Sequence, residues 1–185
     1  MRKVIVSNLV SLDGYIEGPN ADLDWPVVEE EFFKYAEDML ESVDTILFGR
    51  KTYEMMAAYW PTETVVENDP VIAGEMNSLP KIVFSSTLTK VDWENSTLIK
   101  HNIEEEILKL KSKPGKDIVI LGSGSIVSQL TQANLIDEYR LIVNPVILGS
   151  GTPEFTGNIS KKALKLTDLK RLKSGVVILY YQPIN

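Results

Sequence analysis

The chain has 185 residues, a length that predicts one domain over 1–185 because domains commonly hold about 100–200 residues. Cysteine is absent and His101 is the only histidine, which excludes disulfides, thiolate nucleophiles and metal centres that need two imidazoles. With 26 acidic and 19 basic residues the formal net charge is −7, the wrong sign for general binding to nucleic acid or anionic membranes. We therefore expect a protein without a metal. A reducing compartment suits a chain without cysteine, so we also expect the protein to be cytoplasmic.

Apolar runs rich in β-branched residues predict six strands. They cover residues 4–10, 45–48, 81–84, 118–121, 139–143 and 176–181. The first five runs are mostly continuous rather than alternating, which is typical of strands covered on both faces. The apolar run at 4–10 is too short for a signal peptide, so we interpret it as the first strand.

Helical periodicity lies between these strands. Apolar residues at steps of three and four predict a helix over Pro26–Glu41, opened by its proline. A second helix is predicted over Ile103–Lys113, with Asn102 as its N-cap. A third is expected over Ser125–Ala133, and a short one after Arg50.

The alternation of strands and helices predicts an α/β fold with a central, mostly parallel sheet and helices on both faces. The C-terminal segment departs from this pattern. Two runs, 164–172 and 176–182, flank the turn 173–175 and predict an antiparallel β-hairpin at the edge of the sheet.

The segment 118–126 reads as a buried strand followed by Gly122-Ser123-Gly124-Ser125-Ile126 and a helix. Glycine lets the backbone approach a phosphate closely, and a helix N-terminus offers free N–H groups. Val127 occupies the third glycine position of the dinucleotide fingerprint, so a plain tight turn is the alternative.

A second strand end carries Gly49, Arg50, Lys51 and Thr52, which combine a turn, two cations and a hydroxyl at a helix start. Solvated surface cations are the alternative, although positive charge is unfavourable at that end of a helix dipole. Ser85 and Ser86 follow a third strand. Parallel strand ends meet at one edge, so these loops could together hold one extended anionic ligand.

The loop 11–25 follows the first strand and contains Asp13, Asp22 and Asp24. Its place predicts a substrate lid in which a carboxylate protonates or binds a heterocycle. Alternatively, Asp22 or Asp24 caps the following helix. His101 is interpreted as an exposed loop residue, and without a G-x-S-x-G elbow hydrolase chemistry is not favoured.

Five segments form a pattern that runs in order along essentially the whole chain. They are Ser11–Ile16, Gly49–Glu54, Ser85-Ser86, Leu121–Ser125 and Ile136–Gly151, of which the last is the most specific. Together they resemble the dihydrofolate reductase-like superfamily. Within it, the chain is most similar to the C-terminal domain of the riboflavin-pathway pyrimidine reductase and to its stand-alone bacterial relatives.

The resemblance implies a dihydrofolate reductase-like three-layer fold, with NADPH bound across the strand ends and hydride transfer to a nitrogen heterocycle. It places Arg50 at the adenosine 2′-phosphate and Asp13 at the substrate pocket, with Asp22 as the alternative proton-handling group. The cofactor-binding residues that it implies are Gly49, Arg50, Lys51, Thr52, Ser85, Ser86, Gly122, Ser123, Gly124, Ser125 and Ile126.

Two positions depart from the dihydrofolate reductases. Those enzymes hold the folate glutamate with an arginine just before the third strand, where this chain reads Asn77-Ser78-Leu79-Pro80-Lys81. They also usually carry an arginine where Ser125 stands. The pyrimidine reductase is usually fused to a zinc deaminase, whose ligands this chain lacks.

The sequence therefore predicts an NADPH-dependent reductase of a pyrimidine- or pterin-like small molecule, similar to 5-amino-6-(5-phosphoribosylamino)uracil reductase. A dihydrofolate reductase and a non-catalytic NADPH-binding module are the alternatives. We expect a homodimer, as in relatives of this branch, with the C-terminal hairpin as a possible contact.

Overall fold

The computed structural model describes residues 1–184. The strands are β1 (Val4–Ser11), β2 (Tyr15–Glu17), β3 (Val43–Gly49), β4 (Lys81–Phe84), β5 (Ser96–Ile99), β6 (Asp117–Ile120), β7 (Glu138–Asn144), β8 (Thr152–Pro153), β9 (Leu164–Arg171) and β10 (Val177–Pro183). The helices are α1 (Glu30–Glu41), α2 (Arg50–Tyr59), α3 (Glu63–Asn68), α4 (Pro70–Ser78), α5 (Ile103–Ser112) and α6 (Gly124–Gln132). Across residues 1–184, none of the helices has the length and apolarity needed to cross a bilayer.

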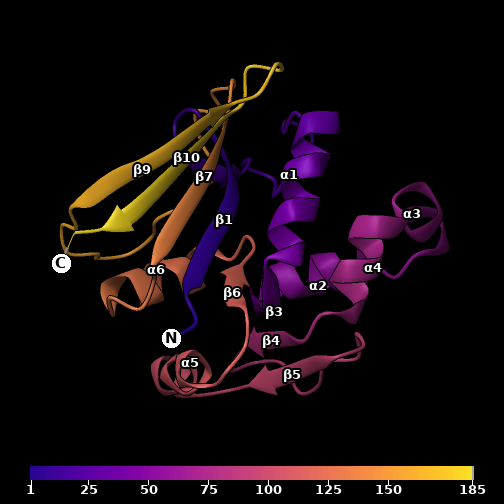
Figure 1. The fold of residues 1–185 in the computed structure, drawn as a ribbon, viewed down its shortest axis with the longest axis vertical. Helices are drawn as coiled ribbons and strands as arrows, with labels where there is room; N and C mark the ends of the chain where they lie inside the picture. The colour runs from indigo at the N-terminus through magenta and orange to yellow at the C-terminus, as the bar shows by residue number, and fades with distance from the viewer. Residues whose placement is uncertain (185) are drawn as a thin grey trace.

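One sheet of eight strands organises the molecule, in the order β5-β4-β3-β6-β1-β7-β10-β9 (Figure 1). Strands β5 to β7 in this order pair in parallel, whereas β10 is antiparallel to both β7 and β9. The prediction of a mostly parallel α/β sheet with an antiparallel C-terminal hairpin is confirmed. Strands β2 and β8 form a separate two-stranded sheet.

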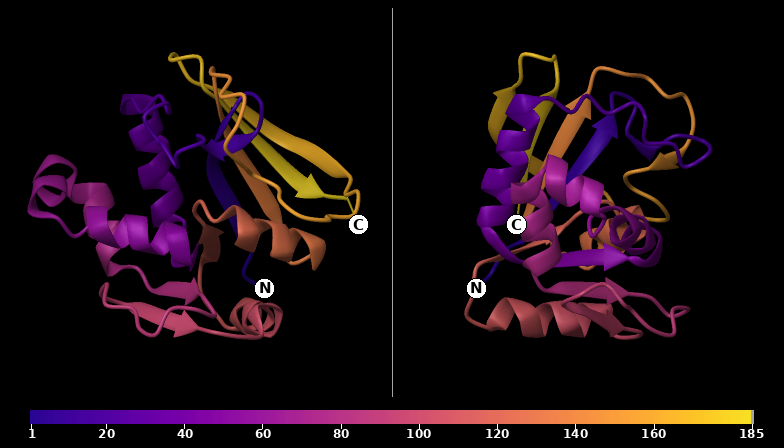
Figure 2. Two further views of the ribbon diagram at one scale, coloured as in Figure 1. Left: turned by 180° about the vertical axis from the view of Figure 1, so that it is seen from behind. Right: turned by 90° about the vertical axis from the view of Figure 1, so that its right-hand side faces the viewer.

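Helices cover both faces of the sheet, as Figures 1 and 2 show. On one face, Met39 of α1 and Met76 of α4 pack with Phe48 of β3 in one buried cluster. On the other, Ile107 of α5 and Leu130 of α6 pack against buried residues of β1 and β6. Successive residues of a strand point to opposite faces, so continuous apolar runs supply both layers.

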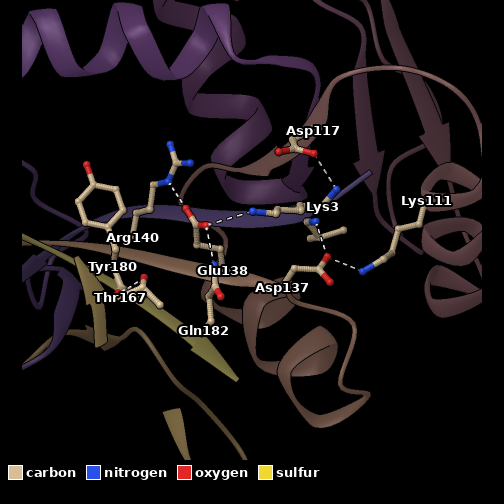
Figure 3. A network of polar contacts seen from close by, with 10 residues as sticks. Lys3, Lys111, Asp117, Asp137, Glu138, Arg140, Thr167, Tyr180 and Gln182 are labelled. Carbon is tan, nitrogen blue, oxygen red and sulfur yellow. Dashed lines mark hydrogen bonds and ion pairs between the residues drawn. The ribbon is translucent and has the colours of Figure 1, made fainter. Parts of the chain in front are cut away.

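The amino-terminal ends of the strands are joined by charged hydrogen bonds (Figure 3). The Asp137 carboxylate accepts from Val4 N at 2.7 Å and pairs with Lys111 of α5. Asp117 accepts from Lys3 N at 2.8 Å. These bonds fix the start of β1 against its two neighbours, which leaves the loops at the opposite, carboxyl end to form a site.

Helix α1 begins later than its sequence pattern predicts. The prediction of a helix from Pro26 is wrong, because Val27 N donates to the side-chain Oδ1 of Asn144 at 2.8 Å, and Glu29 is extended. The helix therefore starts at Glu30, and neither Asp22 nor Asp24 caps it. Side chains far away in the sequence decide this boundary.

Two other helix starts differ in detail from the predictions. Asn102 does precede α5, but it has a left-handed conformation and its side chain forms no capping hydrogen bond. Helix α6 begins at Gly124, one residue earlier than predicted, and ends at Gln132. Helices α3 and α4 and strands β2, β5 and β8 were not predicted.

The turn of the C-terminal hairpin contacts the start of α1. Lys173 N donates to the Glu31 carboxylate at 2.6 Å, and the Lys173 side chain lies 3.9 Å from the same carboxylate. The antiparallel hairpin therefore reaches a helix on the face of the sheet that carries α1.

We predict that Asn144→Ala destabilises the protein. Asn144 is fully buried, and its loss would leave the Val27 N–H without its acceptor, at a cost of about 1–3 kcal/mol in the free energy of unfolding. Urea denaturation measures this change. Asn158→Ala, which alters an exposed asparagine, is the matched control, and equal stability of the two variants would contradict the prediction.

Candidate functional site

The carboxyl ends of the parallel strands β1, β3, β4 and β6 lie at one edge of the sheet. The segments that follow these strands contain Asp13, Arg50, Ser85 and Gly122. In open α/β sheets this edge is where ligands bind.

Hydrogen bonds lock the loop between β6 and α6 against the start of α2. Gly122 and Ser123 both have positive φ, at +62° and +59°. The Ser123 hydroxyl accepts from Gly49 N at 2.7 Å, while Thr52 Oγ1 accepts from Ser123 N at 3.0 Å. A Cβ on Gly122 would lie 2.9 Å from Thr52 Cγ2, so only glycine combines this conformation with this spacing.

Helix α6 begins at the end of this loop, and helix α2 begins beside it after β3. Neither helix has a side-chain cap. Ser123 occupies the N-cap position of α6, but its hydroxyl is bonded to Gly49 and Thr52 instead. The backbone N–H groups of a first helical turn have no intrahelical partners. Two adjacent uncapped helix starts provide the donors that a diphosphate requires.

Asn8 of β1 binds this loop through its side-chain amide, and the buried carboxylate of Glu154 binds the same amide. Its side-chain amide donates to Gly122 O at 3.0 Å and accepts from Gly122 N at 2.7 Å. The same amide nitrogen donates to both Glu154 oxygens, at 3.0 and 2.9 Å. Because both Glu154 oxygens accept from the Asn8 amide nitrogen, Glu154 fixes which end of the Asn8 amide faces which group of Gly122.

Glu154 is 2 % exposed. Burial raises the pKa of its carboxyl to about 7, and the hydrogen bond from Asn8 opposes that rise. No local pattern marks this residue, because the fold brings it to Asn8 across 146 positions of the chain.

A cavity of about 820 Å³ opens beside this loop on the face that carries α1 and α4. Asn8, Gly122 and Ser123 form part of its wall, together with Lys51 and Thr52 of α2. Its other lining residues are largely apolar and come from α1, α2 and α4, from strands β1 and β7, and from the segment 16–28. This volume lies within the range typical of small-molecule sites.

A second cavity, of about 720 Å³, lies beyond β4 and β5. Ser85 and Ser86 line it, and so do His101 and Ile126. His101 is exposed, as the sequence indicated, but it faces this cavity beside the predicted serines. Helix α6 contributes to both spaces, since Ser123 at its N-cap lines the larger cavity and Ile126 the smaller one.

Arg50 lies at the start of α2 and lines neither cavity. Its guanidinium is half-exposed and pairs with Glu54 at 3.2 Å, one helical turn away. Exposed pairs of this kind are weak, so the guanidinium could exchange Glu54 for a phosphate at little cost.

Backbone N–H groups hold both predicted catalytic aspartates. Asp13 accepts from Leu148 N at 3.1 Å and Gly149 N at 2.8 Å, and it also accepts from the Ser11 hydroxyl. The bond from Ser11, with those from the backbone, lowers the pKa of Asp13 despite slight desolvation. Asp22 accepts from Asn20 N at 2.9 Å. Neither carboxylate lines the larger cavity, so their catalytic role remains a prediction that this geometry does not support.

A family model described as the RibD C-terminal domain matches residues 2–178. The chain belongs to this family. This chain is 36 % identical over 180 residues to YyaP, an uncharacterized protein of Bacillus subtilis strain 168, and the match covers 97 % of this chain and 94 % of YyaP. YwjB of the same strain, also uncharacterized, is 28 % identical over 180 residues, which is 97 % of each chain.

Solved structures place this RibD C-terminal domain in the dihydrofolate reductase-like fold. A Shewanella sp. PV-4 protein whose name refers to riboflavin biosynthesis is 25 % identical, with a TM-score of 0.77 and 99 % of each chain covered. Dihydrofolate reductase from Enterococcus faecalis, complexed with NADP(H), has a TM-score of 0.68 at 17 % identity, covering 99 % of this chain and 97 % of that enzyme.

A two-function protein from Thermotoga maritima also shares the fold of this domain. It is named as a diaminohydroxyphosphoribosylaminopyrimidine deaminase and 5-amino-6-(5-phosphoribosylamino)uracil reductase. The TM-score is 0.70 at 14 % identity, and the match covers 99 % of this chain but 57 % of that one. The family and the fold that the sequence motifs indicated are thus confirmed.

We predict that Glu154→Gln flattens the pH dependence of stability. The folded protein keeps a proton on Glu154 up to about pH 7, whereas the unfolded chain releases it near the ordinary pKa of 4.5. Stability contributed by this group is therefore lost as pH rises between these values. The glutamine side chain does not titrate, so the free energy of unfolding of the variant should rise relative to that of the native chain as the pH increases. At about 1.36 kcal/mol per pKa unit, the difference should grow by roughly 2 kcal/mol between pH 5 and 8.

Urea denaturation at several pH values measures this difference. Glu63→Gln, at an exposed position, should leave the pH dependence of the native chain unchanged. A constant offset between the Glu154→Gln variant and the native chain across this pH range would show that Glu154 does not titrate there.

Proposed function

We propose that the protein is an NADPH-dependent reductase of a pyrimidine- or pterin-like small molecule. Membership of the RibD C-terminal domain family supports a reductase. The observation that carries the proposal is the pair of uncapped helix starts, α2 and α6, joined through Gly49, Thr52 and Ser123 beside the larger cavity.

The residues at this edge fit a phosphorylated dinucleotide. The tight approach of Gly122 to Thr52 requires glycine at position 122 and holds the backbone of this loop against the start of α2. We assign residues 122–126 to the pyrophosphate and nicotinamide end, Lys51 and Thr52 to the pyrophosphate, and Ser85 and Ser86 to the adenosine end. Arg50, at the start of α2, would hold the adenosine 2′-phosphate. When bound, the cofactor would supply a hydride.

The side chains of the larger cavity would orient the substrate and exclude water from it. Apolar walls from α1 and α4 surround the space next to Asn8 and Gly122. Asp13 would act by holding the loop 148–149 in place rather than by touching the substrate. The proton would then come from water or from a carboxylate that does line the cavity, such as Asp69.

Calorimetric titration with NADPH near physiological salt, followed by NADPH oxidation with a panel of pterins and aminouracils, tests the proposal. Binding and oxidation would support a reductase, and no binding would end the proposal. Tight NADPH binding without oxidation would favour the non-catalytic module. Stoichiometric inhibition by antifolates would instead favour a folate reductase.

We predict that Arg50→Ala weakens binding of NADPH far more than of NADH, because only NADPH carries the 2′-phosphate. A charge-assisted contact of about 1.4 kcal/mol or more gives at least a tenfold change in Kd. Lys34→Ala, which breaks another exposed helical ion pair with Asp38, is the control and should change neither affinity. Equal losses for NADPH and NADH in calorimetry would refute the assignment of Arg50.

We also propose a homodimer that uses the C-terminal hairpin. Strand β9 is the edge of the sheet, and its Leu166 and Leu169 are 46 % and 53 % exposed. An open edge with exposed leucines is suited to pairing with a second strand.

We predict that Leu169→Lys shifts the molar mass measured by light scattering towards the monomer, whereas Leu108→Lys on α5 does not. A native chain that is already a monomer would contradict the proposal.

A further inference from the structure

The larger cavity lacks the charge that a phosphorylated substrate requires. Among residues 1–184, Lys51 is the only basic side chain in its lining, whereas three carboxylates, Glu17, Glu54 and Asp69, face it. A phosphate group carries close to two negative charges and is bound in proteins by arginine forks or several cations. The balance of charge in this lining therefore opposes a phosphate.

Two further cations next to this lining do not correct the balance. Arg140 adjoins Tyr35 but is paired with Glu138, 2.7 Å away. Arg50 lines neither cavity and lies 3.2 Å from Glu54, with which it pairs. Lys51 sits beside Thr52 and the loop 122–123, where the proposed function assigns it to the pyrophosphate of the cofactor. No basic side chain of the described lining is then left for an anionic group on the substrate.

The walls are instead suited to a flat apolar molecule. Aromatic rings of α1, including Phe32 and Tyr35, face the cavity, and so do four methionines. Methionine adapts its shape and packs well against aromatic rings. The methionines are Met39, Met55, Met56 and Met76.

The apolar lining continues to the protein surface. Five of its large apolar side chains are more than a third exposed, which is unusual for residues of a cavity wall. They are Leu23, Val28, Phe33, Met55 and Tyr59. An apolar rim of this kind would cover a hydrophobic substituent that projects from the bound ring.

We propose that this cavity takes a flat heterocycle that is neutral or cationic, carries no phosphate or carboxylate, and bears an apolar substituent that reaches the rim. This inference rests on the proposed reductase function and narrows its substrate class. It separates this chain from a reductase of 5-amino-6-(5-phosphoribosylamino)uracil, the activity named for the Thermotoga maritima neighbour, whose substrate carries a phosphate.

Two matched probes test the proposal by calorimetry on the full chain, with and without NADPH. One is 5-benzyluracil, and the other is the same compound with a phosphonomethyl group on the benzyl ring. The first should bind at least tenfold more tightly. Equal or tighter binding of the phosphonate, or binding of neither probe, would overturn the proposal.

A pair of variants locates the binding. Phe33→Ser alters a rim residue that is 40 % exposed and should weaken the apolar probe at least fivefold. Phe155→Ser is the matched control, because Phe155 is 41 % exposed and lies outside the cavity. Equal effects of the two variants would place the probe elsewhere and overturn the proposal.

The NADPH titration separates the two proposals. If NADPH fails to bind while the apolar probe binds in a Phe33-dependent way, the reductase function fails and the cavity chemistry stands. If NADPH binds and the phosphonate is preferred, the reductase function stands and the substrate class is wrong.

Discussion

The hydrogen bonds around Gly122 and Ser123 are the constraint on which the rest of the site depends. Asn8 binds both backbone groups of Gly122, and Ser123 joins Gly49 to Thr52. These contacts connect β1, β3, α2 and α6. They also occupy the Ser123 hydroxyl at the N-cap of α6, while Gly49 at the N-cap of α2 has no side chain, so neither helix start has a side-chain cap.

Charge is divided between the two sides of this loop. The chain has a net charge of −7, but the start of α2 carries two adjacent cations, Arg50 and Lys51. The proposed cofactor site therefore has positive charge of its own. The larger cavity holds more carboxylates than cations and is otherwise apolar. A dinucleotide and a phosphate-free heterocycle are the pair of ligands that this division suits best.

Local signals were enough for most of the sheet and for the loops that end its strands. Continuous β-branched runs such as 118–121 have few alternatives to a buried strand, and glycine followed by a helical pattern marks the turn after it. Local signals failed for β5, which is a short, partly exposed edge strand, and for α4, which begins at Asp69-Pro70 and lacks a clear apolar stripe. The start of α1 depends on Asn144, and Glu154 acts through Asn8, so both depend on contacts between distant segments.

The hydrogen bond from Lys173 N to Glu31 joins the turn of the C-terminal hairpin to the first helix. Helix α1 supplies much of the aromatic wall of the larger cavity, and β9 of the same hairpin is the open margin of the sheet. A molecule that binds to β9 would therefore contact a hairpin whose turn is bonded to α1, and α1 lines the substrate cavity. Assembly and ligand capture would then be thermodynamically linked in this protein, each altering the strength of the other.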